Sequence, residues 1–395
     1  MEQTLAMLKN DDLINPYDSY EKMREQSPIL KKRLCKQSGW FVTGYKEAKA
    51  ILTDSRFQTR IPLPTTTKKY ETTATVQKNM VLYQNPPDHK KLREIMSEYF
   101  TTKALANINE MMEKTTEELV REAKKKKTLD VVSEYAFPLA SSVIASIIGV
   151  PEKDKELFRK WAYSLVQTID LNRNRKALLE GNDTVDAMVT YFHERMKIRD
   201  MSDHSLLHGL MQAKQQGKVT EDEIVSTCIL LLIAGHETTV NLISNLVYCF
   251  AQFPDQYAAL QERPTLVKGA VEECLRFESP TQLTARVVSD DCVLHGVEMK
   301  KGEQVYIMLG AANRDPAQFK DPNLFIITRT PNAHLTFGAG QHFCIGSMLA
   351  RLEAEVAIET LRNHLSTIKL DKAEIQWRKL AGFRALEKLT LQLQQ

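Results

Sequence analysis

The chain has 395 residues, of which 43% are hydrophobic and 26% are charged, a composition typical of a globular protein. Its 53 basic and 50 acidic residues give a net charge of +3, so we expect neither nucleic acid nor an anionic membrane as a partner. The N-terminus lacks a basic start followed by an apolar run, and six cysteines are scattered along the chain, which predicts a cytoplasmic protein with free thiols. No linker rich in glycine, proline or serine divides residues 1–395, so one domain is predicted.

The first part of the chain predicts a mixture of helix and strand. Residues 17–26 are expected to form a helix, residues 39–43 a strand that ends at Gly44, and residues 46–52 a second helix. The polar segment from about Arg60 to Asn79 is expected to be a long loop, of the kind that forms lids or binding walls.

From Asp88 to about Arg263 the pattern predicts one helix after another. Apolar residues recur at helical spacing in four segments, 110–125, 131–148, 154–168 and 176–197. Residues 221–250 predict one long, largely buried helix. A further helix is expected over 265–277, with Pro264 at its start.

After Pro280 the pattern changes. Residues 293–297 and 304–309 predict strands, residues 346–364 a strong helix, and residues 380–393 a hairpin. The predicted fold class is therefore mainly α (α+β), with a large helical part and a smaller strand-rich part.

The segment before the last helix, residues 337–346, reads Phe-Gly-Ala-Gly-Gln-His-Phe-Cys-Ile-Gly. Its three glycines predict a tightly bent backbone, and a cysteine at a helix N-terminus has a stabilised thiolate. Three interpretations of Cys344 remain open from the residues alone. It is a thiolate ligand of haem iron, a small buried hydrophobe, or a zinc ligand together with His342, Cys292 and His295.

Residues 234–239, Ala-Gly-His-Glu-Thr-Thr, interrupt the long apolar helix. A carboxylate and two hydroxyls destabilise a buried helix unless they are paired or used. Gly235 costs ~1 kcal/mol relative to alanine, and Thr238 can bond the carbonyl four residues earlier. Together they predict a groove for a small ligand and water; the alternative is a polar stripe that faces solvent.

Other charged positions are weak signals when taken singly. Glu273 and Arg276 lie three residues apart on one helix face, a spacing that most often gives a surface ion pair. His89, Arg93 and Arg286 are each typical of surface cations.

Taken together and in this order, the motifs resemble those of the cytochrome P450 family. The loop matches the family's haem-binding signature, Phe then Gly-x-Gly-x-His-x-Cys-x-Gly, at every defining position. Ala339 and Ile345 differ from common preferences at positions that do not define it. The resemblance implies a haem b cofactor whose axial ligand is Cys344, with Phe337 and Gly338 in the cofactor-binding loop.

The resemblance also implies roles for the other charged and polar residues. Thr238 and Glu237 would supply protons during oxygen activation. The haem propionates would be held by four cations, His89, Arg93, Arg286 and His342. A structural cluster beneath the haem loop would comprise Glu273, Arg276 and, as a third partner, Arg329.

The chain resembles the subfamily that holds macrolide hydroxylases and the Bacillus biotin-pathway enzyme, and residues 39–45, 60–64 and 382–386 are especially similar to the biotin-pathway member. This likeness implies a monooxygenase that hydroxylates or oxidatively cleaves a fatty acid or fatty acyl chain, free or on acyl carrier protein. The alternatives are a hydroxylase of a macrolide, terpenoid or other secondary metabolite, a peroxygenase, and a non-catalytic haem-binding protein. The expected substrate wall comprises Ile61, Ile233, Ala234, Gln282, Leu283 and Phe383.

The same likeness implies a monomer that takes electrons from a separate ferredoxin or flavodoxin with its reductase. A small acidic donor would meet a basic face on the thiolate side, to which Lys90 and Lys91 contribute.

Overall fold

The computed structural model describes residues 13–34, 37–59, 70–171, 173–198 and 204–393. The chain forms two compact units. The first falls within residues 1–58, 113–136 and 239–395, and the second within residues 59–112 and 137–238. Each unit is built from segments that are distant in sequence, and the expectation of one domain stays a prediction.

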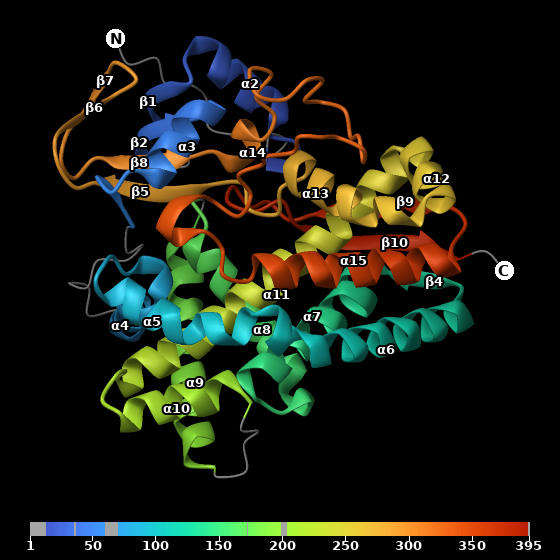
Figure 1. Cartoon of the computed structure of the whole chain (residues 1–395), viewed down its shortest axis with the longest axis horizontal. Coiled ribbons are helices and arrows are strands. Elements are labelled where there is room, and N and C mark those ends of the chain that lie inside the picture. The colour runs from blue at the N-terminus through green and yellow to red at the C-terminus, as the bar shows by residue number, and fades with distance from the viewer. Residues whose placement is uncertain (1–12, 35–36, 60–69, 172, 199–203, 394–395) are drawn as a thin grey trace. The chain divides into compact units, whose positions relative to one another are not determined.

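The first unit contains a five-stranded sheet. Its strands lie in the order β1 (Ile29–Leu34), β2 (Gln37–Val42), β8 (Gln304–Ile307), β5 (Thr284–Val288) and β3 (Phe57–Gln58). The blue N-terminal strands thus lie beside the orange strands that follow residue 280 (Figure 1). Strands β2 and β8 are parallel, and the other neighbours are antiparallel. The strand-rich part therefore includes N-terminal residues.

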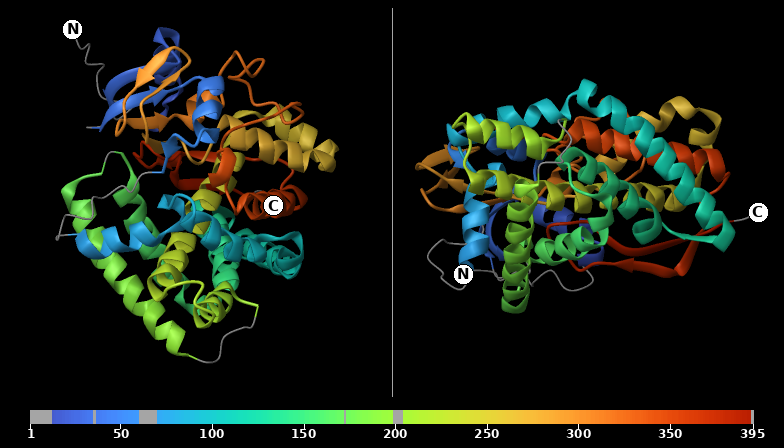
Figure 2. Two further views of the ribbon diagram at one scale, coloured as in Figure 1. Left: turned by 60° about the vertical axis from the view of Figure 1, so that its left-hand side comes forward. Right: turned by 90° about the horizontal axis from the view of Figure 1, so that it is seen from below.

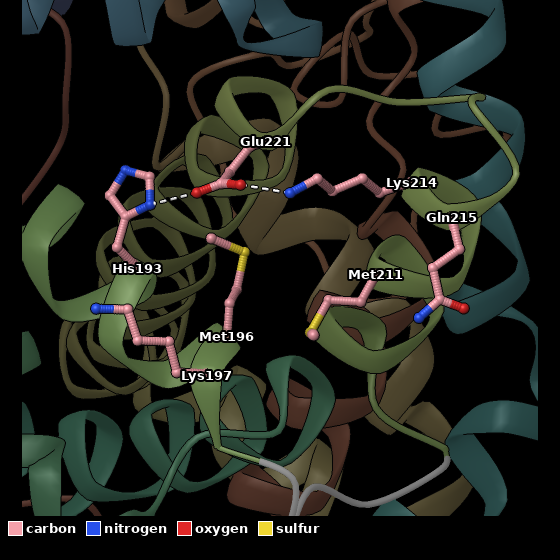
Figure 3. Close-up of a pocket in the computed structure, with 7 residues that line it drawn as sticks. All are labelled: His193, Met196, Lys197, Met211, Lys214, Gln215 and Glu221. Atoms are coloured by element: carbon pink, nitrogen blue, oxygen red, sulfur yellow. Dashed lines mark hydrogen bonds and ion pairs between the residues drawn. The ribbon is translucent and has the colours of Figure 1, made fainter.

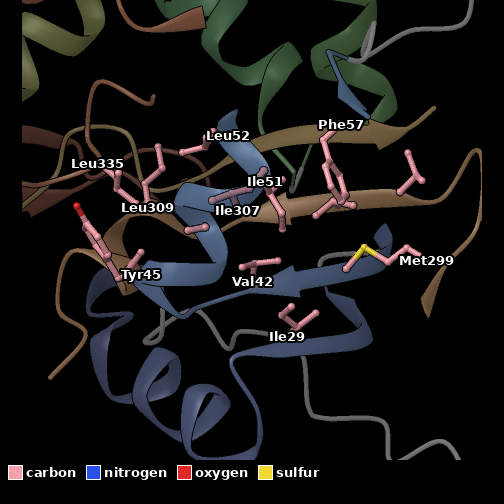
Figure 4. Close-up of a cluster of buried hydrophobic side chains, with 14 of the residues drawn as sticks. Ile29, Val42, Tyr45, Ile51, Leu52, Phe57, Met299, Ile307, Leu309 and Leu335 are labelled. Carbon is pink, nitrogen blue, oxygen red and sulfur yellow. The ribbon is translucent and has the colours of Figure 1, made fainter. Parts of the chain in front are cut away.

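One face of this sheet is covered by helix α3 (Tyr45–Thr53), and a hydrophobic cluster fills the space between them (Figure 4). Val42, Ile51 and Ile307 are all fully buried in it. Because the buried residues Tyr45, Ala48, Ile51 and Leu52 recur every three or four positions, α3 turns one apolar side to the cluster.

The first unit also contains further helices and strands. They are α2 (Tyr17–Gln26), α12 (Pro254–Glu262), η6 (Pro264–Leu266), α13 (Val267–Phe277), β6 (Cys292–Leu294), β7 (Val297–Met299), α14 (Leu309–Ala312), α15 (Ser347–His364), β9 (Leu370–Trp377) and β10 (Leu386–Gln392). Strand β10 pairs on its other side with β4 (Thr128–Asp130), and a π-helix over Val131–Ala136 follows.

The second unit is helical. Its helices are α4 (Glu71–Asn79), α5 (Asp88–Ser97), α7 (Phe137–Ile148), α8 (Lys155–Ile169), α9 (Arg175–Lys197) and α10 (Leu206–Gln215). The green helices α8 and α9 pack against each other (Figure 2). Two helices belong to both units, α6 (Thr102–Lys126) and α11 (Glu221–Gln252).

The predicted fold class is confirmed, and several helices fall where the pattern placed them. The helix over residues 17–26 is α2, and the long central helix extends two residues beyond its predicted end, to Gln252. The apolar periodicity is strong in these segments, and so the prediction from sequence is accurate there.

Three predicted elements are wrong in part. The loop expected up to Asn79 contains helix α4 from Glu71, which the hydrogen bond from Thr73 to Asn182 of α9 anchors. The strand expected over residues 293–297 is a hairpin, because His295 and Gly296 take positive φ angles of 47° and 79° and reverse the chain. The C-terminal hairpin begins earlier than predicted, at Leu370.

Two helical segments are long and apolar enough to cross a membrane by composition, Val131–Ile148 and Glu221–Gln252. Each is 78% buried within the protein over its most apolar window. Burial of this extent is typical of the core helices of a folded protein, which pass the same test.

Candidate active site

The loop that carries Cys344 is held by short backbone bonds in the first unit. The amide of Cys344 donates to the carbonyl of Phe337 at 2.9 Å, and the amide of Gly338 donates to Leu335 at 2.8 Å. Gly338 and Gly340 have φ angles of 72° and 71°, which L side chains rarely adopt. A Cβ at Gly340 would lie 2.7 Å from the carbonyl oxygen of Leu52 in α3, so this position also needs glycine for close packing.

A charged clamp fixes the aromatic start of this loop. The guanidinium of Arg351 lies 4.6 Å above the ring of Phe337 and donates to the carboxylate of Glu272. His334 contacts the same carboxylate at 3.2 Å. Burial alone would raise the pKa of Glu272, but hydrogen bonds from His334 and Arg351 hold it at about 2. Glu272 and Arg351 therefore position Phe337, a role that the sequence analysis did not assign to them.

Glu273 and Arg276 form a fully buried, bidentate ion pair, with N–O distances of 2.9 and 2.8 Å. Arg329 donates to both carboxylate oxygens at 3.1 Å, so the expected third partner is in contact. Arg276 also donates to three backbone carbonyls, those of Asn313, Pro322 and Leu324. A surface pair, the interpretation of this spacing taken alone, is ruled out by the burial.

The surroundings of Arg286 on β5 indicate whether the residues present could hold a haem propionate. Its side chain is 7% exposed and donates to Thr284 and Ala285. Among the residues that the structure describes, no carboxylate forms an ion pair with it, and burial lowers the pKa of its guanidinium to about 10. A buried cation without an acidic partner is unfavourable, and a carboxylate of a bound cofactor would relieve it. The donor set thus fits a haem propionate.

In the second unit, the exposed part of α11 is narrow. Ala234 is exposed, and Ile233, Glu237 and Thr238 are partly buried, whereas the residues before and after them are mostly buried. The hydroxyl of Thr238 donates to the carbonyl of Ala234 at 2.6 Å, the bond to the preceding turn that the sequence predicted. Glu237 and Thr238 therefore lie on one short, partly accessible face of the helix.

The expected groove at Gly235 is wrong, because helix α7 occupies that space. A Cβ at Gly235 would lie 2.7 Å from Cδ1 and 2.9 Å from Cγ1 of Ile144. The glycine thus allows α7 and α11 to approach each other closely. Next to it, His236 is buried, stacks on Phe137 at 5.7 Å and bonds the carbonyl of Leu232 at 2.6 Å. Burial lowers the pKa of His236 to about 4, so it is neutral at physiological pH.

Helix α5 brings His89 and Arg93 one turn apart. His89 is buried, and burial together with the charge of Arg93 lowers its pKa. On the outer face of α5, Lys90 is exposed beside Glu94, while Lys91 forms an ion pair with Glu223 at 3.1 Å. Part of the expected basic face is thus neutralised.

The expected wall residues differ in exposure. Gln282 is buried, and its amide donates to Ser279 at 2.7 Å, whereas Leu283 and Phe383 are partly exposed. Ile61 lies outside the described residues. His342 is partly buried in the thiolate loop.

A surface pocket of about 480 Å³ lies among α9, α10 and α11 of the second unit (Figure 3). Glu221 accepts from His193 at 2.7 Å and from Lys214, and Met196 and Met211 lie between the helices. It includes none of the predicted site residues. Elsewhere in the described residues, no three His, Cys, Asp or Glu side chains group around a metal position, which removes the support for zinc at Cys344.

Comparison with known proteins agrees with this geometry. The cytochrome P450 family model matches residues 7–376. The biotin biosynthesis cytochrome P450 of Bacillus subtilis is 50% identical over 95% of this chain and 96% of its own length. The 6-deoxyerythronolide B hydroxylase of Saccharopolyspora erythraea is 32% identical over 99% of both chains.

Among solved structures, P450BioI in complex with acyl carrier protein ligated by hexadec-9Z-enoic acid matches with a TM-score of 0.94. It is 49% identical in sequence, and the match covers 97% of this chain and 100% of that one. The chain belongs to the cytochrome P450 family. It is therefore a monooxygenase that uses haem with a cysteine thiolate as the iron ligand and takes electrons from a separate redox partner.

Proposed function

We propose that this enzyme oxidises a fatty acyl chain presented by an acyl carrier protein, by hydroxylation or oxidative cleavage. The likeness to the biotin-biosynthesis P450 carries the proposal, because its 50% identity well exceeds the 32% shared with the macrolide hydroxylase. The solved relative with acyl carrier protein bound supports the same class of substrate. The likeness to bacterial P450 enzymes also supports the cytoplasmic location that we propose.

In this proposal Cys344 would bind the haem iron, and Arg286, His342, His89 and Arg93 would hold the propionates. Phe337 and Gly338 would belong to the loop that binds the cofactor. When bound, the haem supplies reductive activation of O₂ at a thiolate-ligated iron. The balance is one C–H bond, one O₂, two electrons and two protons converted to one C–OH and one water.

The chain's own contribution to this balance is the protons. Thr238 presents a hydroxyl that donates to the Ala234 carbonyl at 2.6 Å, which leaves its oxygen able to accept a hydrogen bond and so to hold a proton-donating group in place. The partly exposed carboxylate of Glu237, one residue before, is able to exchange protons with water.

The deciding experiment is substrate binding read from the low-spin to high-spin change of the ferric haem. We expect palmitoyl-acyl carrier protein to produce the change at lower concentration than free palmitic acid, and a macrolide aglycone to produce none. Turnover with a ferredoxin and its reductase should then give a hydroxylated or cleaved acyl product. A spin change with the macrolide alone would contradict the proposal, and turnover only with hydrogen peroxide would favour a peroxygenase.

The ligand assignment has its own test. We expect Cys344→Ala to lose the carbon monoxide difference band that is characteristic of a thiolate ligand, because no sulfur then reaches the iron. The control is Cys292→Ala, which removes a thiol from β6 in the same unit. Retention of the band in Cys344→Ala would disprove the assignment.

A further inference from the structure

A second buried ion cluster, centred on Glu278, is distinct from the Glu273 cluster. Glu278 directly follows α13 and is 5% exposed. It accepts from Arg384 at 2.7 Å, from the hydroxyl of Tyr17 at 3.0 Å and from Arg314 at 3.4 Å. Three chain segments, from the N-terminal helix to the C-terminal hairpin, thus meet at one carboxylate.

Arg384 is the member of this cluster that belongs to the C-terminal loop between β9 and β10. It is 5% exposed, its guanidinium lies 3.5 Å from the ring centre of Trp377, and it also donates to the carbonyl of Ile14. Burial alone would lower its pKa, but the charge of Glu278 raises it overall, so the guanidinium stays charged. Removing only one partner of an ion pair this deeply buried would leave the other charge unpaired and would destabilise the protein.

The backbone on both sides of this ion pair forms a short ladder. The amide of Gln282 donates to Gly382, and the amide of Arg384 donates to Pro280, each at 2.9 Å. Thr281 and Phe383 form the antiparallel bridge between these two bonds. The ladder joins the segment that carries Leu283 to the loop that carries Phe383.

Asn245 of α11 also forms hydrogen bonds with the residues of this ladder. Its side-chain amide donates to the carbonyls of Glu278 at 3.1 Å and Arg384 at 2.9 Å, and it is fully buried. Leu283 and Phe383 remain partly exposed beside these buried residues. Because Leu283 lies three residues before Arg286, it is roughly 10 Å from it along an extended chain. Leu283 is therefore close along the chain to the residue that would hold a propionate, and the ladder brings the loop of Phe383 beside the segment that carries Leu283.

We infer that Arg384 is a positioning residue that, through its ion pair with Glu278, sets where Phe383 and Leu283 stand in the substrate wall. This inference rests on the proposed function only in taking these two side chains as part of the wall. Tyr17 assists by donating to Oε2 of Glu278, the same carboxylate oxygen that accepts from Arg384. The carboxylate–guanidinium pair thus acts at a distance from the substrate, through the ladder.

The test compares phenylimidazole with imidazole as ligands of the ferric haem in the full-length holoprotein. Both bind through a nitrogen, but only phenylimidazole adds a ring that contacts the wall. We expect Arg384→Lys and the milder Tyr17→Phe to weaken phenylimidazole binding by roughly threefold to tenfold, the range expected when one buried hydrogen bond is lost or misplaced. Imidazole affinity and the carbon monoxide band should stay at wild-type values.

The matched control is Lys379→Gln, which removes an exposed charge from the same loop. A second readout is the distribution of oxidation positions along the acyl chain, which should broaden in Arg384→Lys and not in the control. If both variants lose thermal stability but keep the wild-type ratio of the two affinities, the role of Arg384 is purely structural and the inference is wrong. If the wild-type protein instead neither binds nor oxidises acyl chains, the proposed function is wrong. The ratio of phenylimidazole to imidazole affinity still tests the role of Arg384.

Discussion

At the scale of single residues, the chemistry that we propose depends on side chains whose neighbours in sequence supply their partners. Thr238 bonds the carbonyl of Ala234, one turn back in the same helix, and Cys344 bonds Phe337 within its own loop. Such local pairings leave a pattern in the sequence. For that reason residue types and spacing were enough to propose Glu237 and Thr238, and the loop that carries Cys344, as parts of the site.

Thr238→Ala tests the proton-supplying role directly. We expect the fraction of reducing equivalents that reach product to fall at least roughly tenfold, with hydrogen peroxide released instead, since general acid–base groups contribute ~10²–10⁴ in rate. The carbon monoxide band and the substrate-induced spin change should persist. The comparison variant is Thr239→Val, at the buried neighbouring hydroxyl. Coupling in Thr238→Ala equal to that of wild type would refute the role.

The partners that sequence analysis missed are distant along the chain. Arg351 meets Glu272 across 79 residues, and Arg384 meets Glu278 across 106 residues. No periodicity or local spacing encodes such a pairing, because it depends on how whole elements pack. The Glu278 cluster therefore became visible only when the fold brought its segments together.

At the scale of elements, the contact between α7 and α11 shows how one glycine serves packing. The sequence correctly predicts that Gly235 lies in a long helix. It predicts a groove beside this glycine and not a helix contact, because the local sequence does not reveal which residues pack opposite a helical glycine. Ile144 of α7 lies where the side chain would be. Helix α4 was missed for a related reason, since its threonines are weak helix formers and α9 holds it in place.

A double-mutant cycle tests this contact. We expect Gly235→Ala to destabilise the protein by about 1–2 kcal/mol, because overpacking costs ~1–3 kcal/mol and the better helix propensity of alanine returns up to ~1 kcal/mol. In an Ile144→Ala background the same change should become stabilising by up to ~1 kcal/mol, since the obstructing atoms are gone. Denaturant unfolding followed by circular dichroism measures both. An equal cost in both backgrounds would show that Ile144 is not the obstacle.

At the scale of the whole molecule, stability in acid depends on carboxylates that are paired in the fold. The pKa of Glu272 is lowered from 4.5 to about 2 in the folded protein, so its pairing contributes stability above pH 4.5. That contribution is lost as the pH falls from 4.5 toward 2. Since Glu272 holds Arg351 against Phe337, the thiolate loop should loosen in the same interval.

We expect Glu272→Gln to make unfolding less dependent on pH between 4.5 and about 2, and to lower stability near neutral pH. The measurement is the denaturant midpoint at each pH, with the Soret band as a second probe. Glu359→Gln, at an exposed carboxylate on α15, the helix that carries Arg351, is the control and should keep the wild-type profile. A Glu272→Gln profile parallel to wild type would contradict the assignment.

The Glu278 cluster also has a consequence for how the chain is made. Tyr17 bonds a residue 261 positions later, and the carbonyl of Ile14 accepts from a residue 370 positions later. At a synthesis rate of ~5–20 residues per second, roughly 20–75 seconds pass between the appearance of these ends. During that time helix α2 has left the ribosome, but the distant partners of Tyr17 and of the preceding Ile14 have not all been synthesised.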